Sequence, residues 1–106
     1  MLKEKDYCDD KIRKELIELG YPAHPYDNTE VDKILGAVLL YEAQKWLREE
    51  KNIIVYPEKN SIGWFSATHY NIGKVHRFKY SEEYYDSYEE ALSEGIKEAV
   101  KILKEE

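Results

Sequence analysis

The hydrophobic pattern of this chain changes its period twice, and these changes limit the folds that are open to it. Up to about residue 50, apolar residues recur every three or four positions, as on one face of an α-helix. From Asn52 to Tyr80 the chain is rich in β-branched and aromatic residues with turn signals between them, as in strands. After Ser87 the helical spacing returns. The pattern therefore predicts two helices, three strands and a final helix.

The two N-terminal helices are predicted from their caps and stops. The first covers about residues 10–19, begins at an aspartate cap and stops at Gly20. The stretch YPAHPYDN that follows holds two prolines, which indicates a loop. The second helix is predicted to run from about Asp27 to Glu50, because one wide apolar stripe spans this range.

The stretches IIVY, GWFSATHYNIG and KVHRFKY predict a three-stranded antiparallel meander, with turns at PEKNS and NIG. Side chains of a strand alternate between its two faces, so Trp64 and Tyr70 share one face of the middle strand. Phe65 and His69 share the other. Whichever face the helices cover, aromatic side chains are left on the opposite one.

The acidic, tyrosine-rich stretch YSEEYYDSYEEALSEG resembles a catalytic carboxylate cluster at first sight, but it matches the start of a helix better. Ser87 and Glu90 have the spacing of a capping box, and apolar residues at helical spacing follow to Leu103. The carboxylates also suit the positive end of the helix dipole. We therefore predict one α+β domain over residues 1–106, in the order α-α-β-β-β-α, with the helices mainly on one face of the sheet.

The charge and the cysteine content narrow the partners and the compartment. A formal net charge of −6 over 106 residues opposes the electrostatic attraction on which general nucleic-acid binding depends. The single Cys8 has no partner within the chain for a disulfide, and no apolar run approaches the roughly 20 residues that span a bilayer. We expect a cytoplasmic protein that binds neither nucleic acid nor membrane.

Motifs for catalysis, metal binding and cofactor binding are missing from the sequence. The three histidines and Cys8 have no spacing of known zinc sites, no nucleophile motif occurs, and no glycine-rich loop joins a strand to a helix. His69 and His76 flank a turn and are expected to be solvent-facing or hydrogen-bonded partners. The sequence predicts no catalytic residue, no metal and no cofactor.

The remaining candidates for function are aromatic and basic residues of the predicted sheet. We expect the uncovered sheet face to bind a second copy or a host protein, with Trp64, Tyr70 and Arg77 as the main contacts. The alternative is a small-ligand or nucleotide site, in which Trp64 and Tyr56 stack a base and Arg77 or Lys79 binds a phosphate. A third interpretation is that Arg77 and Lys79 only protect an outer strand from aggregation.

Two segments, AQKWLREEKNIIV at 43–55 and YYDSYEEALSEGIKEAVKIL at 84–103, resemble small uncharacterised proteins encoded by phages and mobile elements of gut bacteria. The resemblance implies an accessory protein of such an element, and it transfers no activity and no site residue. The helix, three strands and helix are also similar in order to double-stranded RNA-binding domains. That similarity implies topology alone, because Glu89 and Glu90 stand where those domains carry phosphate-binding lysines.

Overall fold

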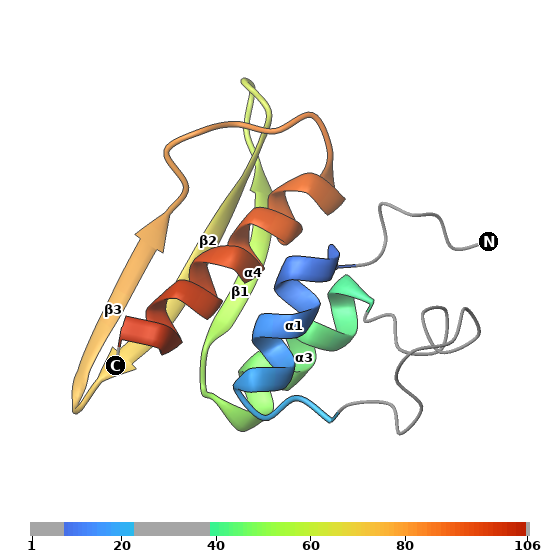
Figure 1. The fold of residues 1–106 in the computed structure, drawn as a ribbon. Coiled ribbons are helices and arrows are strands. Elements are labelled where there is room, and N and C mark those ends of the chain that lie inside the picture. Colours follow the sequence, from blue (N-terminus) through green and yellow to red (C-terminus); the bar gives the residue numbers. More distant parts are fainter. Residues whose placement is uncertain (1–7, 23–38, 106) are drawn as a thin grey trace.

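The computed structural model describes residues 8–22 and 39–105, and these form an α+β fold in the predicted order (Figure 1). The predicted loop beyond Pro22 and the start of the second helix lie outside the described residues. The elements are α1 (Asp10–Glu18), α3 (Leu40–Glu50), β1 (Ile54–Lys59), β2 (Trp64–Ile72), β3 (Val75–Tyr80) and α4 (Tyr88–Glu105).

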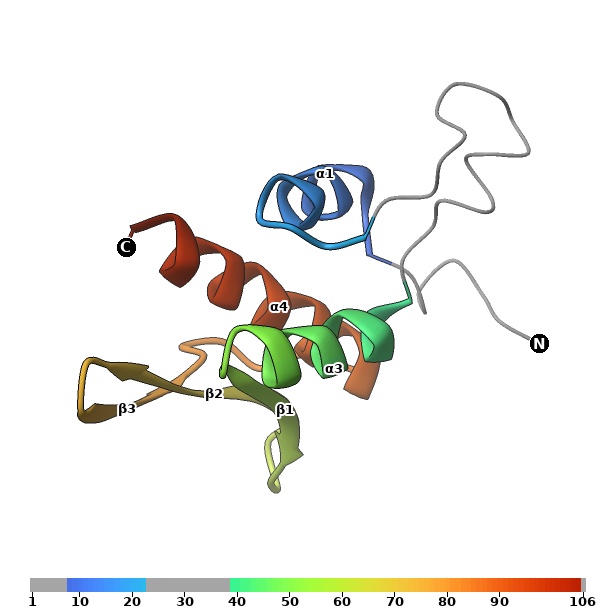
Figure 2. The same ribbon diagram turned by 90° about the horizontal axis from the view of Figure 1, so that it is seen from below.

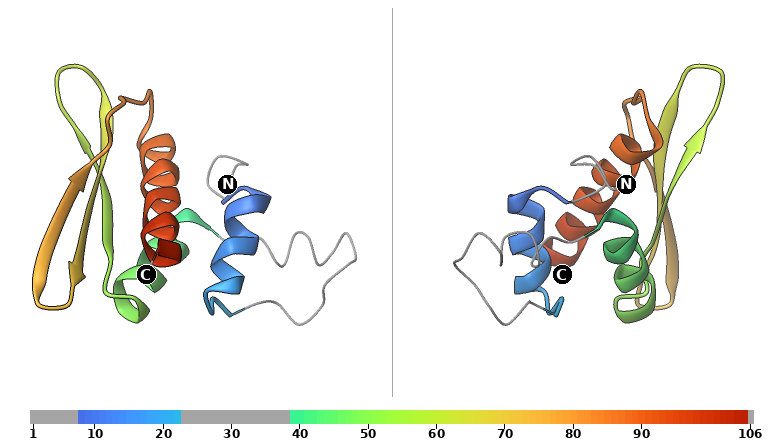
Figure 3. Two further views of the ribbon diagram at one scale, coloured as in Figure 1. Left: turned by 60° about the vertical axis from the view of Figure 1, so that its left-hand side comes forward. Right: turned by 90° about the vertical axis from the view of Figure 1, so that its right-hand side faces the viewer.

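The described elements lie in three tiers. The strands form an antiparallel sheet in the order β1-β2-β3, and α3 and α4 pack against one of its faces. Helix α1 lies on the far side of α4 from the sheet (Figures 2 and 3). The helices therefore cover one face, as predicted, and they do so in two tiers.

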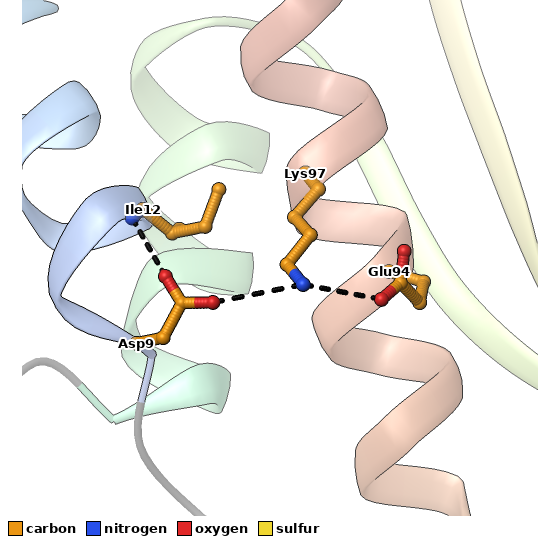
Figure 4. A network of polar contacts seen from close by, with 4 residues as sticks. All are labelled: Asp9, Ile12, Glu94 and Lys97. Atoms are coloured by element: carbon orange, nitrogen blue, oxygen red, sulfur yellow. Dashed lines mark hydrogen bonds and ion pairs between the residues drawn. The ribbon is translucent and has the colours of Figure 1, made fainter.

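Asp9 both starts α1 and connects it to α4. One carboxylate oxygen accepts a hydrogen bond of 2.8 Å from the backbone N–H of Ile12, which is the predicted N-cap. The other oxygen lies 3.6 Å from Nζ of Lys97, which also contacts Glu94 at 3.2 Å (Figure 4). Beneath this network the buried Ile12 and Leu16 pack into the core.

The second helix differs from its prediction, because Leu39 has an extended backbone and α3 begins at Leu40. The N–H of Leu39 donates to a carboxylate oxygen of Glu42 at 3.2 Å, so the new helix start is capped from within. The apolar stripe did not show this break, since a leucine fits the core equally well in a helix and in an extended cap. Leu40, Ala43 and Leu47 are buried, as the stripe predicts.

The turn predicted at PEKNS begins later, because Pro57 and the two residues after it belong to β1. β1 is an edge strand, where a proline is tolerated if its missing N–H faces away from the ladder. Pro57 pairs with Ser66, whose N–H and C=O both bond to Ser81 on the other side. Position 57 therefore needs no donor, and the turn follows at Asn60.

The core forms where α4 crosses the sheet at Gly95. A Cβ added to this glycine would lie 2.5 Å from Cγ1 of Val55 and 3.1 Å from Cβ of Ser66, so only glycine allows this approach. The buried cluster around it contains Cys8, Ile12, Leu16, Leu40, Ala43, Leu47, Ile53, Val55, Leu92, Ile96, Ala99, Val100 and Ile102.

Candidate functional site: the uncovered aromatic face

The contacts of α4 settle which sheet face is covered. Val55, Ser66 and Thr68 point toward α4 and are at most 4% exposed. Their neighbours in the strands therefore point the other way, where no described helix lies (Figure 3). Of the two aromatic sets left open by the sequence, the set with Phe65 and His69 is the uncovered one. We call this surface the aromatic face; its residues are Ile54, Tyr56, Glu58, Phe65, Ala67, His69, Asn71, His76, Phe78 and Tyr80.

The rings of the aromatic face pack against one another. Phe78 lies edge-to-face against Tyr80 and against His69, with ring centroids 4.3 and 4.2 Å apart. Phe65 contacts Tyr80 at 5.5 Å and, beyond the strands, Tyr84 at 5.9 Å. Ala67, in the middle strand on the same face, is fully buried although none of the described helices lies over it. The face is thus an ordered aromatic layer.

A line of polar contacts runs through this layer. The hydroxyl of Tyr56 lies 3.1 Å from Nε2 of His69, and the two rings stack. Nδ1 of His69 lies 3.0 Å from Nε2 of His76, and Nδ1 of His76 lies 3.2 Å from Oδ1 of Asn71. Both imidazoles therefore have each ring nitrogen in a hydrogen bond, which holds their orientation.

The aromatic face carries little charge. Glu58 is its only carboxylate, and no lysine or arginine belongs to it. Burial, together with the neighbouring Glu58 carboxylate, raises the pKa of Tyr56, so its hydroxyl keeps its proton at neutral pH. An apolar centre that is poor in charge is typical of protein interfaces.

The structure places most of the predicted binding residues on the other, helix-facing side of the sheet. Trp64 packs against Tyr88 with ring centroids 5.5 Å apart, and Tyr70 packs against the core. Arg77 and Lys79 pair with residues of the same side of β2, and only Tyr56 lies on the aromatic face. The placement of Trp64, Tyr70 and Arg77 on the uncovered face was therefore wrong.

The residues of the nucleotide alternative are not brought together either. Trp64 and Tyr56 lie on opposite sides of the sheet, so they cannot stack on one base. Lys79 forms an ion pair with Glu98 of α4, and the hydrogen bond to this carboxylate raises the pKa of Lys79. A cleft of about 330 Å³ beside this pair is lined by more carboxylates than cations, which disfavours a phosphate there.

The sequence reasoning missed three main residues of the aromatic face, His76, Phe78 and Tyr80. Their signal was present in KVHRFKY, where basic and aromatic residues alternate with a period of two. The site predictions used only its basic residues, Arg77 and Lys79, and left its aromatic residues aside. In the sheet the alternation separates them, so that Arg77 and Lys79 face α4 and the rings face outward.

Cys8 has the character of a core residue. It is 9% exposed, and burial, with the nearby charges of Asp9 and Glu42, raises the pKa of its thiol to about 12. The thiol is therefore protonated at neutral pH and is a poor nucleophile. Within residues 8–22 and 39–105, no three or more His, Cys, Asp or Glu side chains converge as they would around a metal ion.

Comparisons with other proteins add no relative to this description. No protein-family model matches the chain, and no significant similarity was found to any curated protein or solved structure. In the part of the chain that the structure describes, no helix combines the length and the apolar character needed to cross a membrane.

Proposed function

We propose that this protein is a non-enzymatic interaction module that binds a second copy of itself through the aromatic face. The observation that carries the proposal is the exposure of large rings at one connected surface. The side chain of Phe78 is 43% exposed, that of Tyr80 50% and that of Tyr84 45%. All three nevertheless contact another ring: Phe78 contacts Tyr80, and both Tyr80 and Tyr84 contact Phe65. Connected aromatic surface of this kind marks interaction sites on soluble domains.

The charge distribution supports a second copy as the partner. Two chains of net charge −6 repel each other unless the surfaces that meet are close to neutral. The aromatic face meets this condition, since Glu58 is its only carboxylate. A host protein is the other partner expected from the sequence; a basic one would need several acidic groups, and this face offers Glu58 alone. Two-fold dimers are also the commonest assemblies of small domains.

Packing of face against face is favoured over pairing of strand edges. β3 is one of the two outer strands, and Arg77 and Lys79 project from its helix-facing side. In a sheet continued through β3 of a second copy, these cations would meet the same cations of the partner, which is destabilising. The third interpretation of Arg77 and Lys79, protection of an outer strand, fits this arrangement.

The biological setting belongs to the same proposal. The resemblance of residues 43–55 and 84–103 to small proteins of phages and mobile elements supports an accessory role in such an element. A buried cysteine with a protonated thiol fits a reducing cytoplasm. We place the self-association there.

Sedimentation velocity over a concentration series tests the proposal. The wild-type chain should show a reversible monomer–dimer equilibrium, and Phe78→Ser should shift it toward monomer. Loss of a central aromatic contact typically costs about 2 kcal/mol, which corresponds to a roughly 30-fold weaker dissociation constant. Tyr41→Ser is the matched control, because Tyr41 is 59% exposed on α3, away from the aromatic face.

Two results would overturn the proposal. One is a wild-type chain that stays monomeric at every concentration reached, which would exclude a second copy as the partner. The other is an equal effect of Phe78→Ser and Tyr41→Ser, which would place the interface elsewhere.

A further inference from the structure

The contact between His69 and His76 has a geometry that goes beyond ring packing. The residues lie on neighbouring strands, where His76 pairs with Asn71, so the two imidazoles are diagonal neighbours. Nδ1 of His69 and Nε2 of His76 are 3.0 Å apart. A hydrogen bond needs one donor and one acceptor, so these two nitrogens share a single proton between them.

The same separation suits two ligands of one metal ion. Imidazole nitrogens bound at about 2.0–2.1 Å from an ion lie roughly 2.8–3.4 Å apart when the angle at the ion is about 90–110°. The observed 3.0 Å falls near the right-angle end of that range. In the hydrogen bond the two nitrogens point at each other along the line between the rings, whose centroids are 5.2 Å apart. For an ion to replace the shared proton, each ring therefore has to turn by roughly 40°, while the strands keep their places.

The outer nitrogen of each ring is already held by a neighbour. Nδ1 of His76 lies 3.2 Å from Oδ1 of Asn71, and an amide oxygen only accepts, so Nδ1 carries the hydrogen and Nε2 is left with its lone pair. Nε2 of His69 lies 3.1 Å from the hydroxyl of Tyr56 and accepts from it while Nδ1 holds the shared proton. When an ion takes Nδ1, this proton moves to Nε2, and the Tyr56 hydroxyl can accept from Nε2 while donating to Glu58. Such outer contacts orient the histidine ligands of metal sites.

We propose that His69 and His76 form a two-ligand site for a divalent transition-metal ion, Ni²⁺ or Cu²⁺, in the aromatic face. Imidazole nitrogen suits both ions, and both favour ligands at right angles. Tyr56 and Asn71 act as positioning residues, and water fills the remaining coordination positions. The site does not depend on the proposed self-association, since both histidines belong to one chain.

This inference departs from the sequence-based prediction of no metal. That prediction rested on the spacing of ligands along the chain, where His69 and His76 are separated by a turn. The two-residue turn between Ile72 and Val75 folds β3 back along β2 and brings the two rings together. Spacing along a chain is a weak guide to ligands that come from two strands.

Calorimetric titration of the untagged 106-residue chain with NiCl₂ tests the site. The wild-type chain should bind one Ni²⁺ in a saturable manner. His69→Ala and His76→Ala should each reduce the affinity to the weak background that a variant lacking both histidines shows. Asn71→Ala should reduce the affinity by about tenfold or more. His24→Ala is the matched control, because it removes the remaining histidine of the sequence, and it should bind like the wild type.

Electron paramagnetic resonance with one equivalent of Cu²⁺ gives an independent readout, since nitrogen couplings report how many imidazoles bind the ion. The wild-type spectrum should show two coupled imidazole nitrogens and the His76→Ala spectrum fewer. His76 is exposed on an edge strand, so this variant is expected to fold even where His69→Ala does not, and circular dichroism checks the fold of each variant. The proposal is overturned by a wild-type chain that binds no Ni²⁺ saturably, by a folded His76→Ala with wild-type affinity, or by an equal loss in His24→Ala.

Discussion

At the scale of single residues, polar side chains at helix starts have effects that can be separated from binding. The Oγ atom of Ser87 accepts a hydrogen bond of 3.2 Å from the backbone N–H of Glu90, one of the orphan donors at the start of α4. This contact confirms that the acidic, tyrosine-rich stretch around it begins a helix. The carboxylates of the first turn, Glu89 and Glu90, stand where the helix dipole favours negative charge.

The cap leads to a direct prediction. Ser87→Ala should lower the free energy of unfolding by about 0.5–2 kcal/mol, as loss of an N-cap does, because it leaves an N–H of the first turn without its acceptor. Urea denaturation followed by circular dichroism measures the loss. Ser87→Asp keeps an acceptor and should retain most of the stability. If the aspartate variant were as unstable as the alanine variant, the side-chain cap would not be the cause.

At the scale of elements, the close approach of α4 to the sheet depends on Gly95. Alanine is favoured over glycine within a helix by about 1 kcal/mol, so propensity alone predicts that Gly95→Ala stabilises α4. The added methyl group would however lie 2.5 Å from Cγ1 of Val55, a side chain that is 1% exposed and packed in the core. Overpacking of this kind costs about 1–3 kcal/mol. We expect the variant to be less stable than the wild type.

A double-mutant cycle separates these two effects. Val55→Ala removes the clashing methyl groups at the cost of a cavity, so Gly95→Ala should be less harmful in that background than in the wild type. Thermal and chemical denaturation of the four proteins give the coupling free energy. Strictly additive losses would show that the two positions do not meet as described.

Most of the elements could be predicted from the sequence because their signals are local. Asp9 caps α1 and Ser87 caps α4 through contacts within one turn, and the alternation in β2 follows from strand geometry alone. The break at Leu39 and the strand position of Pro57 escaped prediction. Both depend on neighbours, a capping carboxylate in one case and the outer edge of a sheet in the other.

The candidate site was predicted less well than the fold. An uncovered aromatic face was expected, but the sequence could not show which aromatic set lies on it. That choice depends on Gly95 meeting Val55 and Ser66, a contact between segments some 30 to 40 positions apart. Without knowledge of this contact, Trp64 was chosen for the open side, where the structure has Phe65.

At the scale of the whole molecule, stability should depend on pH in the alkaline range. Burial, with Asp9 and Glu42 nearby, raises the pKa of Cys8 from 9.0 to about 12, so the unfolded chain loses this proton more easily than the folded chain. The resulting stabilisation is complete below about pH 9 and is lost as the pH rises toward 12. The pKa of Tyr21 is also raised, mainly by burial, and that of Lys79 mainly by its hydrogen bond to Glu98. Both groups therefore also make the folded state less stable as the pH rises.

We therefore expect the free energy of unfolding to fall between about pH 9 and pH 12, and to fall less steeply in Cys8→Ala. Urea titrations at several pH values, with a reductant present, measure both slopes. The alanine variant should be less stable at neutral pH, because it leaves space in the core, so the test is the difference in slope. Parallel curves for the two proteins would show that Cys8 does not titrate as described.

The central position of α4 also has a consequence for biosynthesis. This helix contacts the sheet, α3 and α1, yet it follows all of them in the chain. While the protein is being translated, the strands leave the ribosome before α4 does, and the side of the sheet that contains Val55 stays in water. The core of the described fold therefore forms only after α4 has emerged, and until then the nascent chain exposes apolar surface of the kind that chaperones bind.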